Sequence, residues 1–156
     1  MTDSKAEWMK FETVRIGGIS TALTTRSSLA AAAITDCIRQ RKARSRPRLV
    51  FDVNGQGISL YSTNIEYREA VRGADLVHAD GESVVKFTKL FCQKKIPERS
   101  ATTDLVHDIA ELAEKSGLSF FLLGGEPGLA EACAANLRIR YPALRIVGTY
   151  HGFFRD

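Results

Sequence analysis

Long apolar runs, clustered cysteines and a signal-like leader are all missing from this sequence of 156 residues. No apolar stretch approaches the roughly 20 residues that a bilayer-crossing helix needs. The first residues also lack the basic-then-apolar order of a secretory signal, so we expect a cytoplasmic protein. The three cysteines, Cys37, Cys92 and Cys133, form no Cys-x-x-Cys pair or Cys/His cluster with metal-ligand spacing. Each lies in an apolar-periodic segment, so we expect buried, reduced thiols and no metal site.

Positive charge is concentrated in one place. Residues 1–48 carry ten Lys/Arg and four Asp/Glu, whereas the remaining residues carry twelve and fourteen. The excess lies between Arg39 and Arg48. A solvated loop after a helix explains it, because cations are placed well at a helix C-terminus. Attraction to anionic lipid headgroups or phosphates is the alternative. We favour the loop and expect no nucleic-acid partner, since the run has no aromatic residue on which bases would stack.

Strand-like and helix-like patterns alternate along the chain, with no internal repeat or linker. Helix candidates begin at Ser27-Ser28 and Pro127 and cover 65–71, 83–91 and 105–113, and strand candidates cover 14–16, 49–53, 75–79, 118–123 and 144–147. Gly117 stands in the C-terminal glycine position of the helix before it. This alternation predicts βαβ units in a Rossmann-like, doubly wound and mostly parallel sheet with helices on both faces. We expect residues 1–156 to form a single α/β domain, with no second domain.

Three of the predicted strands end in polar or glycine-rich segments. In a parallel sheet such ends meet at one edge, where ligands bind at the point of strand-order reversal. The segments are Asp52 to Gly57, His78 to Glu82, and Gly124 to Gly128. They are the candidates for a binding cleft.

Asp80 has two interpretations. An aspartate followed by a glycine is commonly part of a turn. At a strand end in a cleft, its carboxylate also suits a general base that removes the proton of an attacking hydroxyl. Arg99 is likewise either a surface ion-pair partner of Glu98 or of a neighbour, or a cation that meets the charge on a leaving diphosphate. His78 and His151 have no partner at triad spacing and are predicted to be structural or solvent-facing.

The segment Gly124 to Gly128 is also open to two interpretations. Its glycines allow close backbone approach, and the free N–H groups of the following helix suit a phosphate. A purely structural turn is an equal alternative, because the full Gly-x-Gly-x-x-Gly spacing is absent and Glu126 repels an anion.

Taken in order, these segments resemble the WecG/TagA/CpsF family of glycosyltransferases (glycosyltransferase family 26). The likeness runs from Val14 over almost the whole chain, and its joint order is more specific than any single motif. The matching pieces are Asp52-Val53-Asn54, Tyr67-Arg68-Glu69-Ala70, Ala74-Asp75-Leu76-Val77, Ala79-Asp80-Gly81, Glu98-Arg99, Thr103-Asp104-Leu105, Leu122 to Gly128, Tyr141-Pro142, Ile146-Val147-Gly148 and Gly152-Phe153-Phe154.

The resemblance implies a metal-independent, inverting transfer of N-acetylmannosamine or another hexose from a UDP-sugar, with no cofactor. The implied acceptor is a polyprenyl-diphosphate-linked sugar at the inner face of a bacterial membrane, in surface polysaccharide synthesis. Asp80 is then the catalytic base and Arg99 a second catalytic residue. The substrate-binding residues implied or suggested by position are Asp52, Asn54, Gly81, Asp104, Gly124, Gly125 and Pro127. A non-catalytic nucleotide or sugar-phosphate binding module, or a basic surface adaptor, is the alternative.

The sequence departs from the family pattern at several points. Asp52 stands where the family has a small hydroxyl residue, Ser83 replaces a usual glycine, and Ser100-Ala101-Thr102 replaces Val-x-Gly. The chain ends at Asp156, before the family's further βα units with their Gly-x-Pro-Lys-Gln-Glu motif and membrane-attachment appendage. We expect it to correspond to the N-terminal portion of the enzyme, with an inactive truncated paralogue as the alternative. An uncovered sheet edge is expected to favour self-association.

Overall fold

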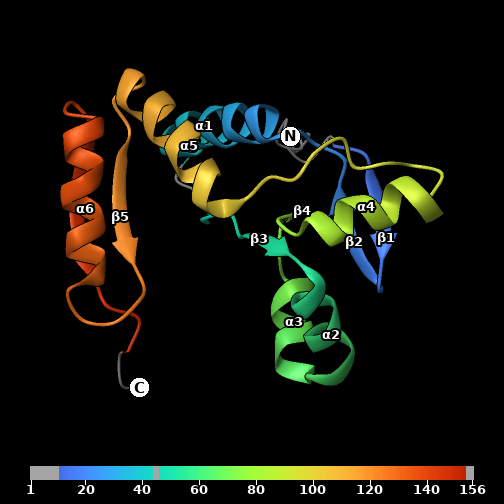
Figure 1. The fold of residues 1–156 in the computed structure, drawn as a ribbon. Helices are drawn as coiled ribbons and strands as arrows, with labels where there is room; N and C mark the ends of the chain where they lie inside the picture. Colours follow the sequence, from blue (N-terminus) through green and yellow to red (C-terminus); the bar gives the residue numbers. More distant parts are fainter. Residues whose placement is uncertain (1–10, 44–45, 154–156) are drawn as a thin grey trace. The chain divides into compact units, whose positions relative to one another are not determined.

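A computed structural model describes residues 11–43 and 46–153, and its elements follow the α/β order predicted above (Figure 1). They divide into two compact units, Met1–Val106 and His107–Asp156, each considered by itself. The elements are β1 (Thr13–Ile16), β2 (Ile19–Ala22), α1 (Arg26–Ala43), β3 (Val50–Val53), α2 (Gly55–Thr63), α3 (Ile65–Arg72), β4 (Leu76–Ala79), α4 (Glu82–Phe91), α5 (Thr102–Lys115), β5 (Ser119–Leu123), α6 (Leu129–Arg140) and β6 (Arg145–Tyr150).

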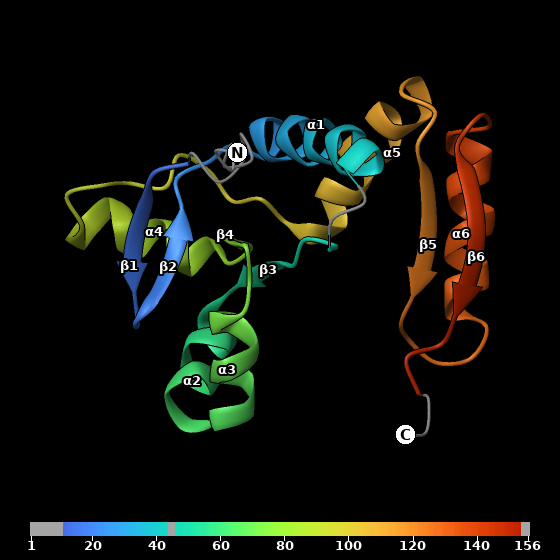
Figure 2. The ribbon, with the colours of Figure 1, turned by 180° about the vertical axis from the view of Figure 1, so that it is seen from behind.

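The first unit contains one antiparallel and one parallel strand pair. β1 and β2 form a hairpin, visible in Figure 2, through a turn in which Gly17 and Gly18 have φ of 54° and 88°. The β2 strand was not predicted from the sequence. β3 and β4 pair in parallel, as the βαβ pattern predicts. Apolar side chains from these strands and the helices after them form two buried clusters, around Ile16 and Val84 and around Ile19 and Val53.

The helices α1, α2 and α3 begin after residues whose side chains accept a backbone N–H hydrogen bond. Thr25, not Ser27 or Ser28, caps α1, since its hydroxyl accepts the Ser28 N–H at 3.2 Å. Asn54 caps α2 and Asn64 caps α3, each through its side-chain oxygen. The helix α2 was not predicted from the sequence, because its first turn contains two glycines, which are poor helix formers. The hydrogen bond that the Asn54 side chain accepts from the Gly57 N–H, together with the burial of Gly57, offsets the low helix propensity of these glycines.

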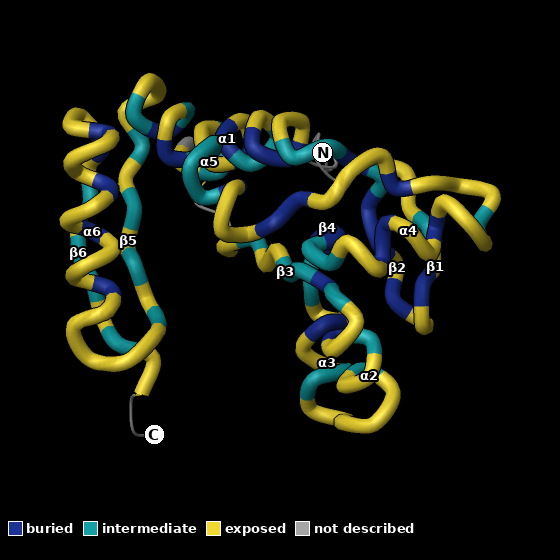
Figure 3. Tube along the Cα trace, viewed as in Figure 1, coloured by how far each residue is buried: buried dark blue, intermediate teal, exposed yellow. Residues whose placement is uncertain are grey.

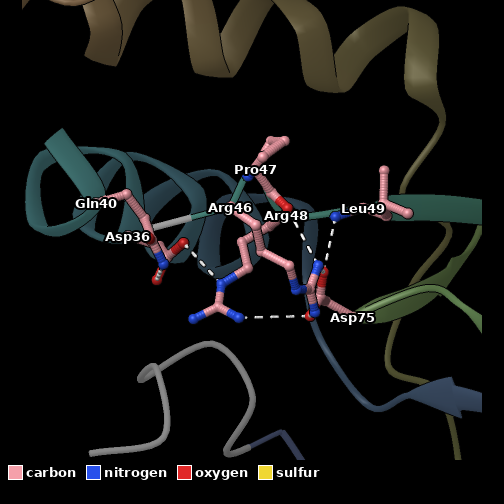
Figure 4. Close-up of polar contacts among 7 residues, drawn as sticks. All are labelled: Asp36, Gln40, Arg46, Pro47, Arg48, Leu49 and Asp75. Atoms are coloured by element: carbon pink, nitrogen blue, oxygen red, sulfur yellow. Dashed lines mark hydrogen bonds and ion pairs between the residues drawn. The ribbon is translucent and has the colours of Figure 1, made fainter. Parts of the chain in front are cut away.

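The amino-terminal ends of β3 and β4 are joined by a charge network (Figure 4). The Asp75 carboxylate accepts two hydrogen bonds from Arg46, at 2.6 and 2.9 Å, and one from the Leu49 N–H at 2.9 Å. Arg48 lies 3.5 Å from Asp75 and 3.6 Å from Asp36 of α1. Two arginines of the basic run, Arg46 and Arg48, are therefore paired with carboxylates, although the Arg46 side chain is still 60% exposed; Arg44 falls outside the described residues.

The second unit is a βαβ arrangement. β5 and β6 pair in parallel, α6 connects them, and Leu137 of α6 is buried. Gly117, with φ of 63°, ends α5 as predicted. The helix expected from Pro127 begins instead at Leu129, because Gly128 takes the left-handed conformation that turns the chain into it.

The α/β class and the parallel pairing predicted from the sequence are confirmed. The strands pair two by two in short sheets, consistent with a Rossmann-like fold. The expectation of buried thiols was wrong: Cys37 and Cys133 are exposed and Cys92 is half-buried. Cys37 lies on α1 and Cys133 on α6, and both helices have many exposed positions (Figure 3).

Candidate functional site

The carboxyl ends of β3 and β4 bring two of the predicted segments together. In the parallel register Asp52 lies beside His78, and Val53 lies beside Ala79. The Asp80 N–H continues the ladder by donating to the Val53 carbonyl at 3.0 Å. Because side chains alternate along a strand, His78 and Asp80 face the same side, with Asp52 across from them. Two carboxylates and an imidazole thus share one face.

Gly81 lies close against the segment that follows β3. A Cβ at this position would lie 3.0 Å from both Cα and Cβ of Asn54, so any side chain would push the segments apart. Asn54 accepts the Gly57 N–H at 3.0 Å and thereby starts α2. Gly81 in turn begins α4, with no side-chain cap of its own. The Asp80-Gly81 pair therefore does more than form a turn: it seats Asp80 against the segment that carries Asn54.

Arg99 is brought to Asp80 across 19 residues of chain. Its Nε lies 3.6 Å from Asp80 Oδ1, with 46% of the arginine side chain and 27% of the aspartate side chain exposed. The loop that carries it is fastened to β4, since the Ser100 N–H donates to the Ala79 carbonyl at 2.8 Å. No ion pair of Arg99 with Glu98 is found in the described residues, where the Glu98 carboxylate accepts the Arg26 N–H at 2.7 Å.

Asp52 and Asp104 have separate partners. Asp52 accepts a hydrogen bond from the Thr102 hydroxyl at 2.9 Å, which ties the end of β3 to the start of α5. The charge of Asp52 also raises the pKa of the Tyr67 phenol, after the larger effect of burial. Asp104 lies 3.3 Å from Arg26 at the start of α1. No contact of Asp104 with Asp80 is found in the described residues.

His78, predicted to be structural or solvent-facing, is a buried polar residue of this face. The side chain is 3% exposed, and its Nδ1 has no hydrogen-bond partner within the described ranges. Burial lowers the pKa of the imidazole, and the nearby carboxylates of Asp52 and Asp80 oppose that shift. The ring is therefore neutral at pH 7. Its apolar neighbours in the strand gave no sequence signal of this role.

The glycine turn of the second unit belongs to the β5–α6 junction. Gly125 has φ of 71°, and a Cβ there would meet the Leu129 side chain at 2.5 Å, so glycine is required by the fold itself. The Gly124 N–H donates to the Tyr150 carbonyl, which leaves that group engaged within the sheet. Pro127 is exposed in the same turn. A structural role thus accounts for both glycines, and their expected phosphate contact stays a prediction.

Two further properties bear on the chemistry. Among residues 11–43 and 46–153 no group of three His, Cys, Asp or Glu side chains is placed to hold a metal ion. In that same part of the chain no helix has both the length and the apolar character needed to cross a membrane.

A pocket of about 430 Å³ lies at the other end of β4, lined among others by Arg15, Arg72 and Asp75. It is separate from the Asp80 face.

The arrangement in the first unit suits the deprotonation of a hydroxyl beside a cation. The Asp80 carboxylate, 27% exposed, is available to accept a proton, and a guanidinium lies next to it. The sequence model of the glycosyl transferase WecG/TagA/CpsF family matches residues 14–156.

Proposed function

Because this chain belongs to the WecG/TagA/CpsF family of glycosyltransferases, we propose that it takes part in the transfer of a hexose from a UDP-sugar to a lipid-diphosphate-linked acceptor. N-acetylmannosamine is the first donor sugar to test. The observation that carries the proposal is the Asp80–Arg99 pair at the end of β4, a base and a cation on one exposed face.

In the proposed reaction Asp80 removes the proton of the acceptor hydroxyl. The hydroxyl oxygen attacks the anomeric carbon of the donor from the face opposite the diphosphate, which inverts the configuration. The bond between that carbon and the diphosphate oxygen breaks, and its electron pair leaves with UDP. The transfer needs one carboxylate, Asp80, as the base for the acceptor hydroxyl, and it does not need the carboxylate pair of a glycosidase.

Arg99 is proposed to meet the charge that develops on the departing diphosphate. Its single contact with Asp80 is through Nε, and nearly half of the side chain is exposed. A guanidinium binds phosphate oxygens through two parallel hydrogen bonds. On donor binding the arginine can therefore turn towards the diphosphate, and that movement also frees the Asp80 carboxylate for the acceptor.

The neighbouring residues are proposed to shape the sugar subsite. Asn54 contacts the donor through its amide nitrogen, because its oxygen is held by Gly57. Asp52 is fixed by Thr102 and presents its other oxygen to sugar hydroxyls. Gly81 keeps the backbone close to the ligand. Asp104, Gly124, Gly125 and Pro127 remain proposed substrate contacts that await a test by substitution.

The test is transfer by the purified chain from UDP-sugars to a polyprenyl-diphosphate-sugar analogue. We expect product with the wild type, a loss of at least about a hundredfold in Asp80→Asn, and unchanged turnover in Glu66→Gln, an exposed carboxylate on α3. Binding of UDP without turnover by the wild type would instead establish a non-catalytic nucleotide module or an inactive paralogue. Equal turnover by Asp80→Asn and the wild type would refute the role of Asp80.

A further inference from the structure

The α4 helix exposes an apolar surface that the candidate reaction does not use. Phe87, Leu90 and Phe91 are 46%, 75% and 73% exposed, although they are large apolar side chains. The rings of Phe87 and Phe91 are 5.1 Å apart between centroids, so these two side chains form one surface. Leu90 follows Phe87 by three residues, which places it on the same side of the helix. In Figure 3 most of α4 is exposed.

The helix has a separate face for the core. Val84, Val85 and Thr88 are buried and lie three to four residues apart, which places them on one side. The apolar residues at 87, 90 and 91 follow the same spacing on another side. The packing of α4 in its own unit is thus complete without them, and the exposed set is an additional apolar face.

Lysines border this apolar face. Between residues 82 and 95 the sequence has four lysines, at positions 86, 89, 94 and 95, and one acidic residue, Glu82, at the start of the helix. Lys94 pairs with Glu12 at 3.0 Å. In the described part of the chain Lys86 and Lys89 form no ion pair. The surface therefore combines aromatic and aliphatic side chains with uncompensated positive charge.

We propose that the α4 face formed by Phe87, Leu90, Phe91, Lys86 and Lys89 docks on the surface of a bilayer that contains anionic lipid. Phenylalanine and leucine enter the boundary between headgroups and acyl chains, and lysines beside them bind the anionic headgroups. Lysine stems can also lie along the apolar surface while their amines reach the headgroups. A second copy of the chain fits this face less well, because a two-fold contact would bring its lysines against their own counterparts.

The docked orientation places the candidate site near the membrane. Asp80 immediately precedes α4, and a helix of ten residues is about 15 Å long. The carboxylate at one end of α4 would then lie roughly a helix length from the bilayer contact at the other. This geometry suits an acceptor whose sugar is tethered to a lipid, and in that respect it rests on the proposed function. The docking itself requires no turnover.

The experiment is flotation of the purified chain with vesicles of phosphatidylcholine, with and without phosphatidylglycerol. We expect binding to the mixed vesicles, weaker binding to phosphatidylcholine alone, and a decrease as salt is raised. Phe87→Ser/Phe91→Ser should weaken binding by more than about tenfold. Lys86→Gln/Lys89→Gln should weaken it by about fivefold for each lysine. Far-UV circular dichroism checks that both variants remain folded, and Leu90→Ser supplies a milder apolar substitution.

Two control variants test whether α4, rather than another surface of the chain, binds the vesicles. Ile65→Ser removes an equally exposed apolar residue from α3 and should leave binding unchanged. Arg39→Gln/Arg41→Gln neutralises the basic end of α1 and should have a smaller effect than the α4 lysine pair. The proposal is overturned if the wild type does not float, or if the arginine variant loses binding while the α4 variants keep it. It is also overturned if the phenylalanine variant changes only the oligomeric mass, which would make a second copy the occupant. Transfer activity enters none of these outcomes, so failure here is distinguishable from failure of the proposed reaction.

Discussion

Replacing Asp75 by asparagine tests whether the charge network of Figure 4 stabilises the strand pair that carries the site. The carboxylate is 4% exposed and accepts hydrogen bonds from Arg46 and from the Leu49 N–H. Asparagine keeps the shape but turns an NH₂ donor towards groups that are donors themselves. The substitution therefore removes the attraction and leaves at least one donor without a partner.

The size of the loss follows from the individual contacts. The Leu49 N–H loses its acceptor, which costs about 1 kcal/mol at a partly exposed site. The pair with Arg48, a side chain that is 25% exposed, contributes about another 1 kcal/mol. Arg46 is largely in solvent, so screening removes most of its contribution. We expect Asp75→Asn to lower the free energy of unfolding by about 2 kcal/mol at pH 7.

The direction of the pKa shift of Asp75 predicts how the stability difference between wild type and variant changes with pH. Hydrogen bonds from Arg46 lower the pKa of the Asp75 carboxyl from its ordinary value of 3.8, against the opposing effect of burial. Since the folded pKa lies below the unfolded one, the stabilisation is complete above about pH 4 and is lost as the pH falls through the folded pKa. The difference between wild type and variant should shrink accordingly.

The assay is urea unfolding followed by far-UV circular dichroism, at pH 7 and at successively lower pH. Glu69→Gln is the matched control, because its pair with Arg72 is 60% exposed on both sides and should give no measurable change. Identical unfolding midpoints for Asp75→Asn and wild type at pH 7 would refute the reasoning. So would a difference that stays constant from pH 7 to below pH 3.

Three further predictions concern the strand ends and the thiols. Gly81→Ala should lower the free energy of unfolding by about 1–3 kcal/mol, because the added Cβ would press on the Asn54 backbone. Gly55→Ala is the control and should not destabilise the protein, because the nearest atom to its added Cβ is 3.7 Å away. Urea unfolding of both variants makes the comparison. Burial lowers the pKa of His78, so the imidazole binds a proton more readily in the unfolded chain than in the folded one. The free energy of unfolding should therefore fall as the pH drops below about 6.5. His78→Gln should show less of this decline, and an equal decline in the variant would contradict the buried, neutral ring. A thiol reagent should label Cys133 first in the native protein and Cys37 after it, because burial and then the charge of Asp36 raise the pKa of the Cys37 thiol, as followed by mass spectrometry; faster labelling of Cys37 than of Cys133 would contradict this order.

Local pattern was enough to identify most elements of the fold. The strands around Phe51, Val77 and Phe121 are compact apolar runs that end in glycine or a polar residue, so each can be predicted from its own residues alone. The hairpin strand β2 and the helix α2 were missed for the opposite reason. Ile19–Ala22 is a strand because β1 pairs with it, and Gly55–Thr63 is a helix because Asn54 caps it.

By itself the sequence determined the α/β class, the family and the identity of Asp80 as the residue to test, because each depends on order and periodicity along the chain. Only the tertiary structure decided what surrounds that residue. Arg99 reaches Asp80 from 19 residues away, and Thr102 reaches Asp52 from 50 residues away, through a loop fastened to β4. Such contacts depend on strand pairing and packing between distant segments, which leave no periodic signal. For the same reason, only the fold distinguished the apolar residues of α4 that enter the core from those that stay exposed.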